Sequence, residues 1–86
     1  MYVILTYDVA AKRNSKVLKV CRKYLSHVQK SVFEGDITEK NLRKLKWELE
    51  KQIDTKKDQI AIYRFDSLRY SSKETLGFFE TNDNIL

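Results

Sequence analysis

Apolar and aromatic side chains occupy six of the first seven positions of the chain, in the run Met1-Tyr-Val-Ile-Leu-Thr-Tyr-Asp8. Residues of this kind at this density predict a buried strand over residues 1–8. Successive side chains of a strand point to opposite faces, so Leu5 lies on one face, and Ile4 and Asp8 lie on the other. Both faces are mostly apolar, and both therefore require cover.

Helical periodicity follows a short connector. Apolar residues at i, i+4 and i+7 predict a helix that starts between Lys12 and Ser15 and ends at Leu25, with Asn14 or Ser15 as the N-cap. Four lysines follow the same spacing on the opposite side: Lys12, Lys16, Lys19 and Lys23. A row of lysines is often only a solvated surface, but without an interleaved acid it favours contact with phosphate.

The next apolar segment, residues 28–34, predicts a second strand that ends at a glycine. Thr38 then begins a second helix as its N-cap, and Ile37 can pack on Leu42 as a hydrophobic staple. The apolar stripe of this helix consists of Leu42, Leu45, Leu49 and Ile53. Trp47 falls off the stripe, where it either covers lysine stems or contacts a partner.

Two more strands are predicted after the polar turn at residues 54–58. The segment 60–65 is apolar on both faces, whereas the segment 69–76 is polar and suits a sheet edge, where charge discourages stray pairing. A glycine ends it. The remaining tail, residues 76–86, carries apolar residues at both ends, which predicts that the tail docks on another surface.

From these strands and two helices we predict an α+β fold, a ferredoxin-like βαββαβ sandwich with a C-terminal extension, in a single domain of residues 1–86. Two helices cover only one face of such a sheet. The first and third strands are nevertheless apolar on both faces. A face-to-face homodimer, with the tail laid across the partner, would supply the missing cover.

Composition narrows the range of partners. The chain has 17 Lys and Arg against 12 Asp and Glu, a net charge of +5, which favours polyanionic partners. One cysteine and one histidine exclude an internal disulfide and the usual zinc ligand sets within one chain. They fit a reducing cytoplasm. No apolar run approaches membrane-spanning length, and we expect no targeting segment in front of the first strand.

Asp8 is the candidate chemical group. A carboxylate at the end of an apolar strand is costly unless a cation or hydrogen-bond donors meet it. Asp8 therefore either caps the next turn, pairs with a lysine, or ligates a metal ion. In a face-to-face dimer the two Asp8 carboxylates would approach each other near the two-fold axis, and they would favour a shared divalent cation.

Four segments together resemble CRISPR-associated protein two: Tyr2-Val-Ile-Leu-Thr-Tyr-Asp8, Arg22-Lys-Tyr-Leu25, Val28-Gln-Lys-Ser-Val-Phe-Glu-Gly35 and Ile62-Tyr63. The resemblance spans the chain and is clearest over residues 1–65. It implies a ferredoxin-like homodimer flanked by two dimers of the CRISPR integrase, with prespacer DNA lying across the assembly. It also implies a magnesium-dependent endonuclease that acts on single-stranded RNA or duplex DNA.

The same resemblance implies that Asp8 is the catalytic residue and the ligand of Mg²⁺, and it extends the nucleic-acid contacts beyond the lysine row. The predicted nucleic-acid-binding residues are Lys12, Arg13, Lys16, Lys19, Lys23, Ser31 and Phe33. Three functions stay open: a DNA-binding scaffold without catalysis, a metal-dependent nuclease of CRISPR adaptation, and a toxin-like endoribonuclease that acts alone. One carboxylate per chain is a sparse ligand set for a nuclease, although Mg²⁺ accepts few protein ligands.

Overall fold

Five strands and two helices make up the described part of the chain, residues 1–66 and 71–77 of a computed structural model. In chain order they are β1 (Tyr2–Asp8), α1 (Ala11–Arg22), β2 (Ser26–Gln29), β3 (Val32–Asp36), α2 (Glu39–Gln52), β4 (Gln59–Phe65) and β5 (Ser71–Gly77). This is the βαββαβ order with one added strand, so the predicted α+β, ferredoxin-like class is confirmed. Neither α1 nor α2 combines the length and the apolar character that a membrane-spanning helix needs.

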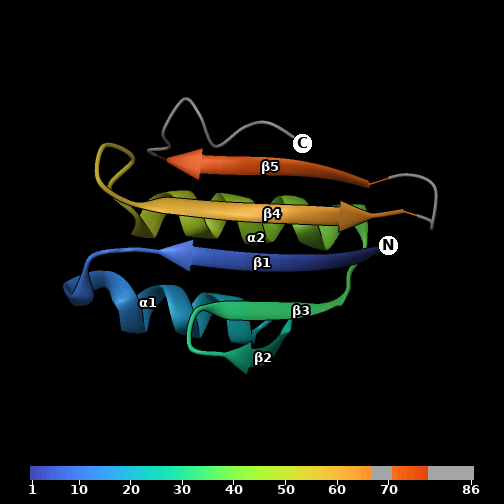
Figure 1. The fold of residues 1–86 in the computed structure, drawn as a ribbon, viewed down its shortest axis with the longest axis horizontal. Coiled ribbons are helices and arrows are strands. Elements are labelled where there is room, and N and C mark those ends of the chain that lie inside the picture. Colours follow the sequence, from blue (N-terminus) through green and yellow to red (C-terminus); the bar gives the residue numbers. More distant parts are fainter. Residues whose placement is uncertain (67–70, 78–86) are drawn as a thin grey trace.

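The strands form one antiparallel sheet in the order β2-β3-β1-β4-β5 (Figure 1). The most apolar strand, β1, lies in the centre, where Leu5 is opposite Phe33 of β3 and Ile62 of β4. A central strand is buried by its neighbours, which is why the apolar run at residues 1–8 occupies this position. The polar β5 lies at the edge, as the sequence predicts.

Both helices cover the same face of the sheet (Figure 1). Between them and the sheet lies the core, whose fully buried members include Leu5, Val17, Phe33, Leu45, Leu49 and Ile62. Burial of each such side chain contributes roughly 1.5–3 kcal/mol. The alternation of β1 decides which residues take part, because Val3, Leu5 and Tyr7 are buried and their neighbours along the strand are not.

Neither α1 nor α2 lies over the opposite face of the sheet (Figure 1). Tyr2 and Phe65, which lie opposite each other in β1 and β4, are 37% and 38% exposed. Ile4 and its register partner Tyr63 are half-buried. This face, which we call the open face, thus carries the second apolar surface that the sequence predicts for β1 and β4.

The single strand predicted over residues 28–34 is wrong. The chain forms a hairpin there, in which β2 and β3 are joined by a turn at residues 30–31, and β3 continues through Gly35. Val28 is 48% exposed in β2 instead of lying in a buried strand. The turn contains neither glycine nor proline, the residues that most often mark a turn in a sequence, so the sequence pattern does not reveal it. The pairing of β2 with β3 also shifts register between His27 and Gln29.

The predicted start of α1 is also wrong. The helix begins at Ala11, and its N-cap Ala10 offers no side-chain hydrogen bond. A distant residue takes the place of the expected Asn14 or Ser15 cap, because the Ala10 N–H donates to Asp58 Oδ1 over 3.0 Å. The negative charge of this carboxylate also lies near the N-terminus of α1, where it interacts favourably with the positive end of the helix dipole.

The prediction for α2 is confirmed at its start and along its buried face. Thr38 Oγ1 accepts a hydrogen bond from the Asn41 N–H at 3.1 Å. The buried side chains of α2 are Leu42, Leu45 and Leu49. At the other end of the chain, Leu76 and Gly77 belong to β5 and not to a tail. The predicted docking of the tail on a partner concerns residues 78–86, which lie outside the described residues.

Candidate functional site

Asp8 is the last residue of β1, at the arrowhead end of the central strand in Figure 1. It is exposed and lies opposite Gln59, the first residue of β4. By the alternation of β1 it shares the open face with Ile4 and Thr6. The carboxylate that the sequence singles out therefore stands at one end of the apolar face that the helices leave uncovered.

The part of the chain that the structure describes contains no cluster of metal-ligating side chains. Within these residues there is no group of three or more His, Cys, Asp and Glu side chains that could bind a metal. Asp8 contributes one carboxylate, and Mg²⁺ keeps several waters when it binds through one or two carboxylates. Asp8 alone is a sparse donor set for Mg²⁺, and a second Asp8 from another copy of the chain would raise it to two carboxylates.

Asp58 lies at the same end of the sheet, directly before Gln59, and it is fully buried. Its carboxylate accepts hydrogen bonds from Arg13 Nε at 2.5 Å, Arg13 Nη2 at 3.0 Å, the Ala10 N–H at 3.0 Å and the Asp54 N–H at 2.9 Å. Together these bonds join the segment that follows β1 to the segment that precedes β4. Asp58 therefore ties the segment that directly follows Asp8 to the turn that leads into the neighbouring strand β4.

The Arg13 guanidinium holds the pKa of Asp58 well below its usual range, and the two backbone N–H groups add to this effect. A buried carboxylate is tolerated when it is paired and fully hydrogen-bonded. The sequence analysis missed this residue, because it treats residues 54–58 as a polar turn. The one available signal is an aspartate that directly precedes an apolar strand, and this signal does not identify the distant partners.

Arg13 was predicted to bind nucleic acid. The structure places its guanidinium in the bidentate ion pair with Asp58, and its side chain is only 15% exposed. The pair leaves little of the guanidinium for a phosphate. Arg13 therefore acts in this structure as a link within the protein.

The predicted lysine row is exposed along α1 and at its C-cap: Lys12, Lys16, Lys19 and Lys23. Lys23 forms an ion pair with Glu48 of α2, and Tyr24 donates its hydroxyl to the same carboxylate. Within the described part of the chain, the other three lysines form no ion pair. Their ammonium groups are accessible to an external anion.

Ser31 and Phe33, the two remaining predicted contacts, are placed differently. Ser31 is half-buried in the β2–β3 turn, where its carbonyl accepts the Tyr7 N–H at 3.0 Å. Phe33 is fully buried, and the ring of His27 stacks on it with the centroids 4.5 Å apart. The Phe33 side chain is therefore inaccessible to nucleic acid, and the prediction of a direct contact there is corrected to a core residue.

The thiol of Cys21 is not a candidate nucleophile. Cys21 is fully buried on the inner face of α1, and burial raises the pKa of its thiol to about 12. A buried thiol in its protonated form is unreactive. Asp8, the predicted catalytic candidate, is thus an exposed group on the surface.

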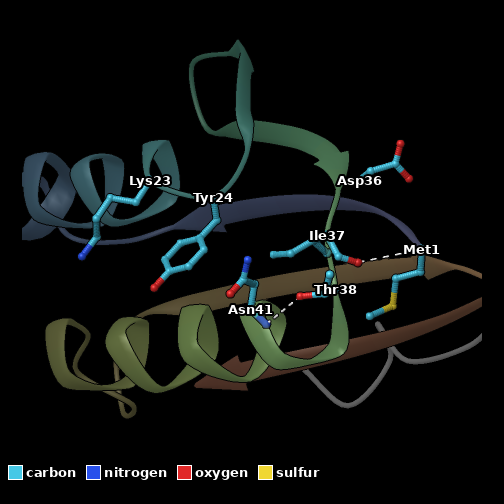
Figure 2. A pocket seen from close by; sticks show the side chains of 7 residues that line it. All are labelled: Met1, Lys23, Tyr24, Asp36, Ile37, Thr38 and Asn41. Carbon is cyan, nitrogen blue, oxygen red and sulfur yellow. Dashed lines mark hydrogen bonds between the residues drawn. The ribbon is translucent and has the colours of Figure 1, made fainter.

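A shallow hollow of about 300 Å³ lies at the other end of β1 (Figure 2). It is lined by Met1, Lys23, Tyr24, Asp36, Ile37, Thr38 and Asn41. Met1 precedes β1 and Asp8 ends it, so the hollow and the carboxylate are separated by the length of the strand. The hollow therefore is not part of the Asp8 site.

The chain is similar to known proteins over most of its length. The family model described as CRISPR associated protein Cas2 matches residues 1–73. The chain is 44% identical over 86 residues to the CRISPR-associated endoribonuclease Cas2 of Thermotoga maritima, covering 100% of this chain and 99% of that protein. It is 46% identical over 86 residues to the CRISPR-associated endoribonuclease Cas2 3 of Thermodesulfovibrio yellowstonii, covering 99% and 98%.

Solved structures agree with these matches. The crystal structure of Streptococcus pyogenes Cas2 at pH 6.5 superposes with a TM-score of 0.70 at 38% identity, covering 76% of this chain and 86% of that one. A crystal structure described as that of cas2 superposes with a TM-score of 0.75 at 30% identity, covering 100% and 97%. The fold described above is thus shared with solved proteins.

Proposed function

Because the chain belongs to the Cas2 family of CRISPR associated proteins, we propose that two copies pair through their open faces and share a magnesium-dependent endonuclease site made of the two Asp8 carboxylates. The observation that carries this proposal is the position of Asp8, exposed at the end of the central strand on the one sheet face without a helix. The relatives named as endoribonucleases support the nuclease activity.

The homodimer follows from the chemistry of the open face. Tyr2, Ile4, Tyr63 and Phe65 form a connected apolar surface on the two paired strands β1 and β4, because they are register neighbours there. Contiguous exposed apolar surface marks an interaction site. A second copy offers the same surface in a self-complementary, two-fold arrangement.

The shared site follows from the ligand count. The two-fold axis that pairs the open faces would bring one Asp8 from each chain together, and two close carboxylates favour a bound cation. The chemistry that Mg²⁺ supplies when bound is activation of an attacking water and stabilisation of the leaving oxygen. Each copy of the chain would contribute one Asp8 carboxylate and, through Asp58, a tie between the segment that follows Asp8 and the turn that precedes β4.

The role in the cell is that of a subunit in spacer acquisition. The exposed lysines of α1 would hold the sugar-phosphate backbone of duplex DNA or single-stranded RNA without sequence readout. The dimer would join the CRISPR integrase dimers in the cytoplasm. A scaffold without catalysis is the second candidate, because the described residues of one chain offer a single surface carboxylate at this site.

Asp8→Asn tests the enzymatic proposal. The variant removes the charge and keeps the shape, so magnesium-dependent cleavage of single-stranded RNA and duplex DNA should fall by orders of magnitude. Melting should show no loss of stability, because Asp8 is exposed. Asp36→Asn is the matched control, since Asp36 is an exposed carboxylate at the other end of the same face and its variant should cleave normally.

Mixing experiments test whether the site is shared. Excess Asp8→Asn chains should inhibit the wild-type protein once the dimers have exchanged, whereas excess Asp36→Asn chains should not. Cleavage that survives in pure Asp8→Asn protein would remove Asp8 from the reaction. Normal nucleic-acid binding without any metal-dependent cleavage in the wild type would leave the scaffold as the function.

A further inference from the structure

Trp47 is the one tryptophan of the chain, and it is 60% exposed on α2. An indole ring exposed to this extent contributes little to the core, whose α2 members are on the opposite side of the helix. The ring also has a defined neighbour, because the Lys51 ammonium lies 3.4 Å from its centroid. This cation–π contact covers part of the ring, and the exposed remainder is accessible to another planar group.

Basic residues surround Trp47. Lys40, Lys44, Trp47 and Lys51 follow the spacing i, i+4, i+7 and i+11, so they form one row along the outer surface of α2. All four are exposed. We call this set the α2 row.

The acids of α2 lie beside this row. Glu48 faces α1, where it accepts bonds from Lys23 and Tyr24. Glu50 and Arg43 are both exposed and flank Trp47 on the other side. Their charges have opposite signs and add no net charge there. The α2 row therefore keeps a positive charge around an accessible aromatic ring.

We propose that the α2 row binds single-stranded nucleic acid, with phosphates on its lysines and an unpaired base stacked on Trp47. Lysines alone would suit any polyanion, and a bare tryptophan would suit an apolar protein surface. A basic row together with an exposed aromatic ring is the arrangement by which proteins bind single-stranded nucleic acids. Bases within a duplex are stacked on each other and offer no free face to Trp47. This surface lies on the helix side of the sheet, away from the open face, and its binding does not depend on Asp8 activity.

Tryptophan fluorescence gives a direct measurement, since all of it arises from residue 47. The probes are oligo(dT) and oligo(U) of ten nucleotides, a ten-base-pair DNA duplex, and inorganic polyphosphate, each titrated in EDTA so that no strand is cut. Binding is measured in parallel by anisotropy of labelled strands. The single strands should quench Trp47, and the duplex and polyphosphate should not. The two single strands together decide whether the 2′-hydroxyl matters.

Variants separate the ring from the lysines. Trp47→Ala should weaken oligo(dT) binding roughly five- to 150-fold, the range expected from loss of one base stack, and Trp47→Phe should restore part of it. The double variant Lys40→Gln/Lys44→Gln should lower the slope of log affinity against log salt concentration by about 1.4. The control Lys56→Gln/Lys57→Gln removes the same charge from exposed residues outside the row and should leave quenching intact.

Three results would overturn the proposal. The first is bound single strand, seen by anisotropy, without any quenching of Trp47. The second is equal quenching by polyphosphate or by the duplex, because neither offers an unpaired base. The third is unchanged affinity in Trp47→Ala protein whose circular dichroism and melting match the wild type, which would leave the α2 row to a protein partner.

Discussion

Two aspartates lie at the same end of the sheet in opposite environments. Asp8 ends β1 and is exposed, whereas Asp58, the residue before Asp8's register partner Gln59, is fully buried. Asp58 accepts four hydrogen bonds from three residues in two separate parts of the chain. Within the described residues, the carboxylate of Asp8 accepts none. The same chemical group is thus a structural link in one position and an exposed surface group in the other.

The difference shows why the exposed aspartate is the functional candidate. A buried carboxylate persists only when its oxygen atoms are satisfied, and this requirement ties Asp58 to Arg13 and to the backbone of Ala10 and Asp54. The tie holds the segment that follows Asp8 against the turn before β4 and leaves the Asp8 side chain exposed. Asp58 is therefore a positioning residue, and Asp8 is the group available to a metal ion.

The largest expected effect is the difference in stability between the Asp58→Asn and Asp8→Asn variants. Asp58→Asn leaves the Arg13 charge without its buried partner, and such losses typically cost about 3–5 kcal/mol. Asp8→Asn should cost nothing measurable, because its carboxylate is exposed. Urea unfolding of both variants and the wild type measures the difference. Equal stabilities of the two variants would show that the Asp58 bonds contribute no more than a surface group.

The second largest effect on stability is expected at Gly77 of β5, which packs against the backbone of Asp58. A Cβ atom at this position would lie 2.1 Å from the Asp58 carbonyl oxygen, and Gly77 has φ of 87°, in the left-handed region. Gly77→Ala should therefore destabilise the protein by about 1–3 kcal/mol, as strained backbone positions do. Thr75→Ala in the same strand should change the free energy of unfolding by no more than about 0.5 kcal/mol.

Melting curves of the Gly77→Ala and Thr75→Ala variants test this prediction. A Gly77→Ala protein as stable as Thr75→Ala would mean that β5 can move away from Asp58 at no cost. In that case the end of the sheet is held by the side-chain bonds of Asp58 alone.

How far the sequence predicts this molecule depends on the range of each interaction. The central strand, the α2 cap at Thr38 and the buried leucines follow from local periodicity, and so does the exposed Asp8. The β2–β3 turn has no glycine or proline, so a local pattern does not detect it. The partners of Asp58 are 45 and 48 residues away at Arg13 and Ala10. Pairings at such a distance are fixed by the fold and not by neighbouring residues.

Acid should weaken the Asp58 link gradually, and this is the smallest of the three effects. The pKa of Asp58 is depressed in the folded state, chiefly by the hydrogen bond from Arg13. Its stabilising contribution is therefore complete above the ordinary aspartate pKa of about 3.9 and is lost as the pH falls through the lower, folded-state pKa. Between pH 7 and 5 the contribution should be constant, and below about pH 4 stability should fall by at most about 1.4 kcal/mol per pH unit for this one group.

The two aspartates make the acid experiment specific. Glu39 and Glu48 also have lowered pKa values, from hydrogen bonds with Arg64 and Lys23, so every variant keeps a common acid dependence from them. Asp8→Asn should retain the full wild-type slope below pH 4, because the Asp58 bonds are intact in it. Asp58→Asn should show a shallower slope from a lower starting stability, measured by urea unfolding at each pH. An unchanged slope in Asp58→Asn would mean that the surface glutamates alone produce the acid sensitivity.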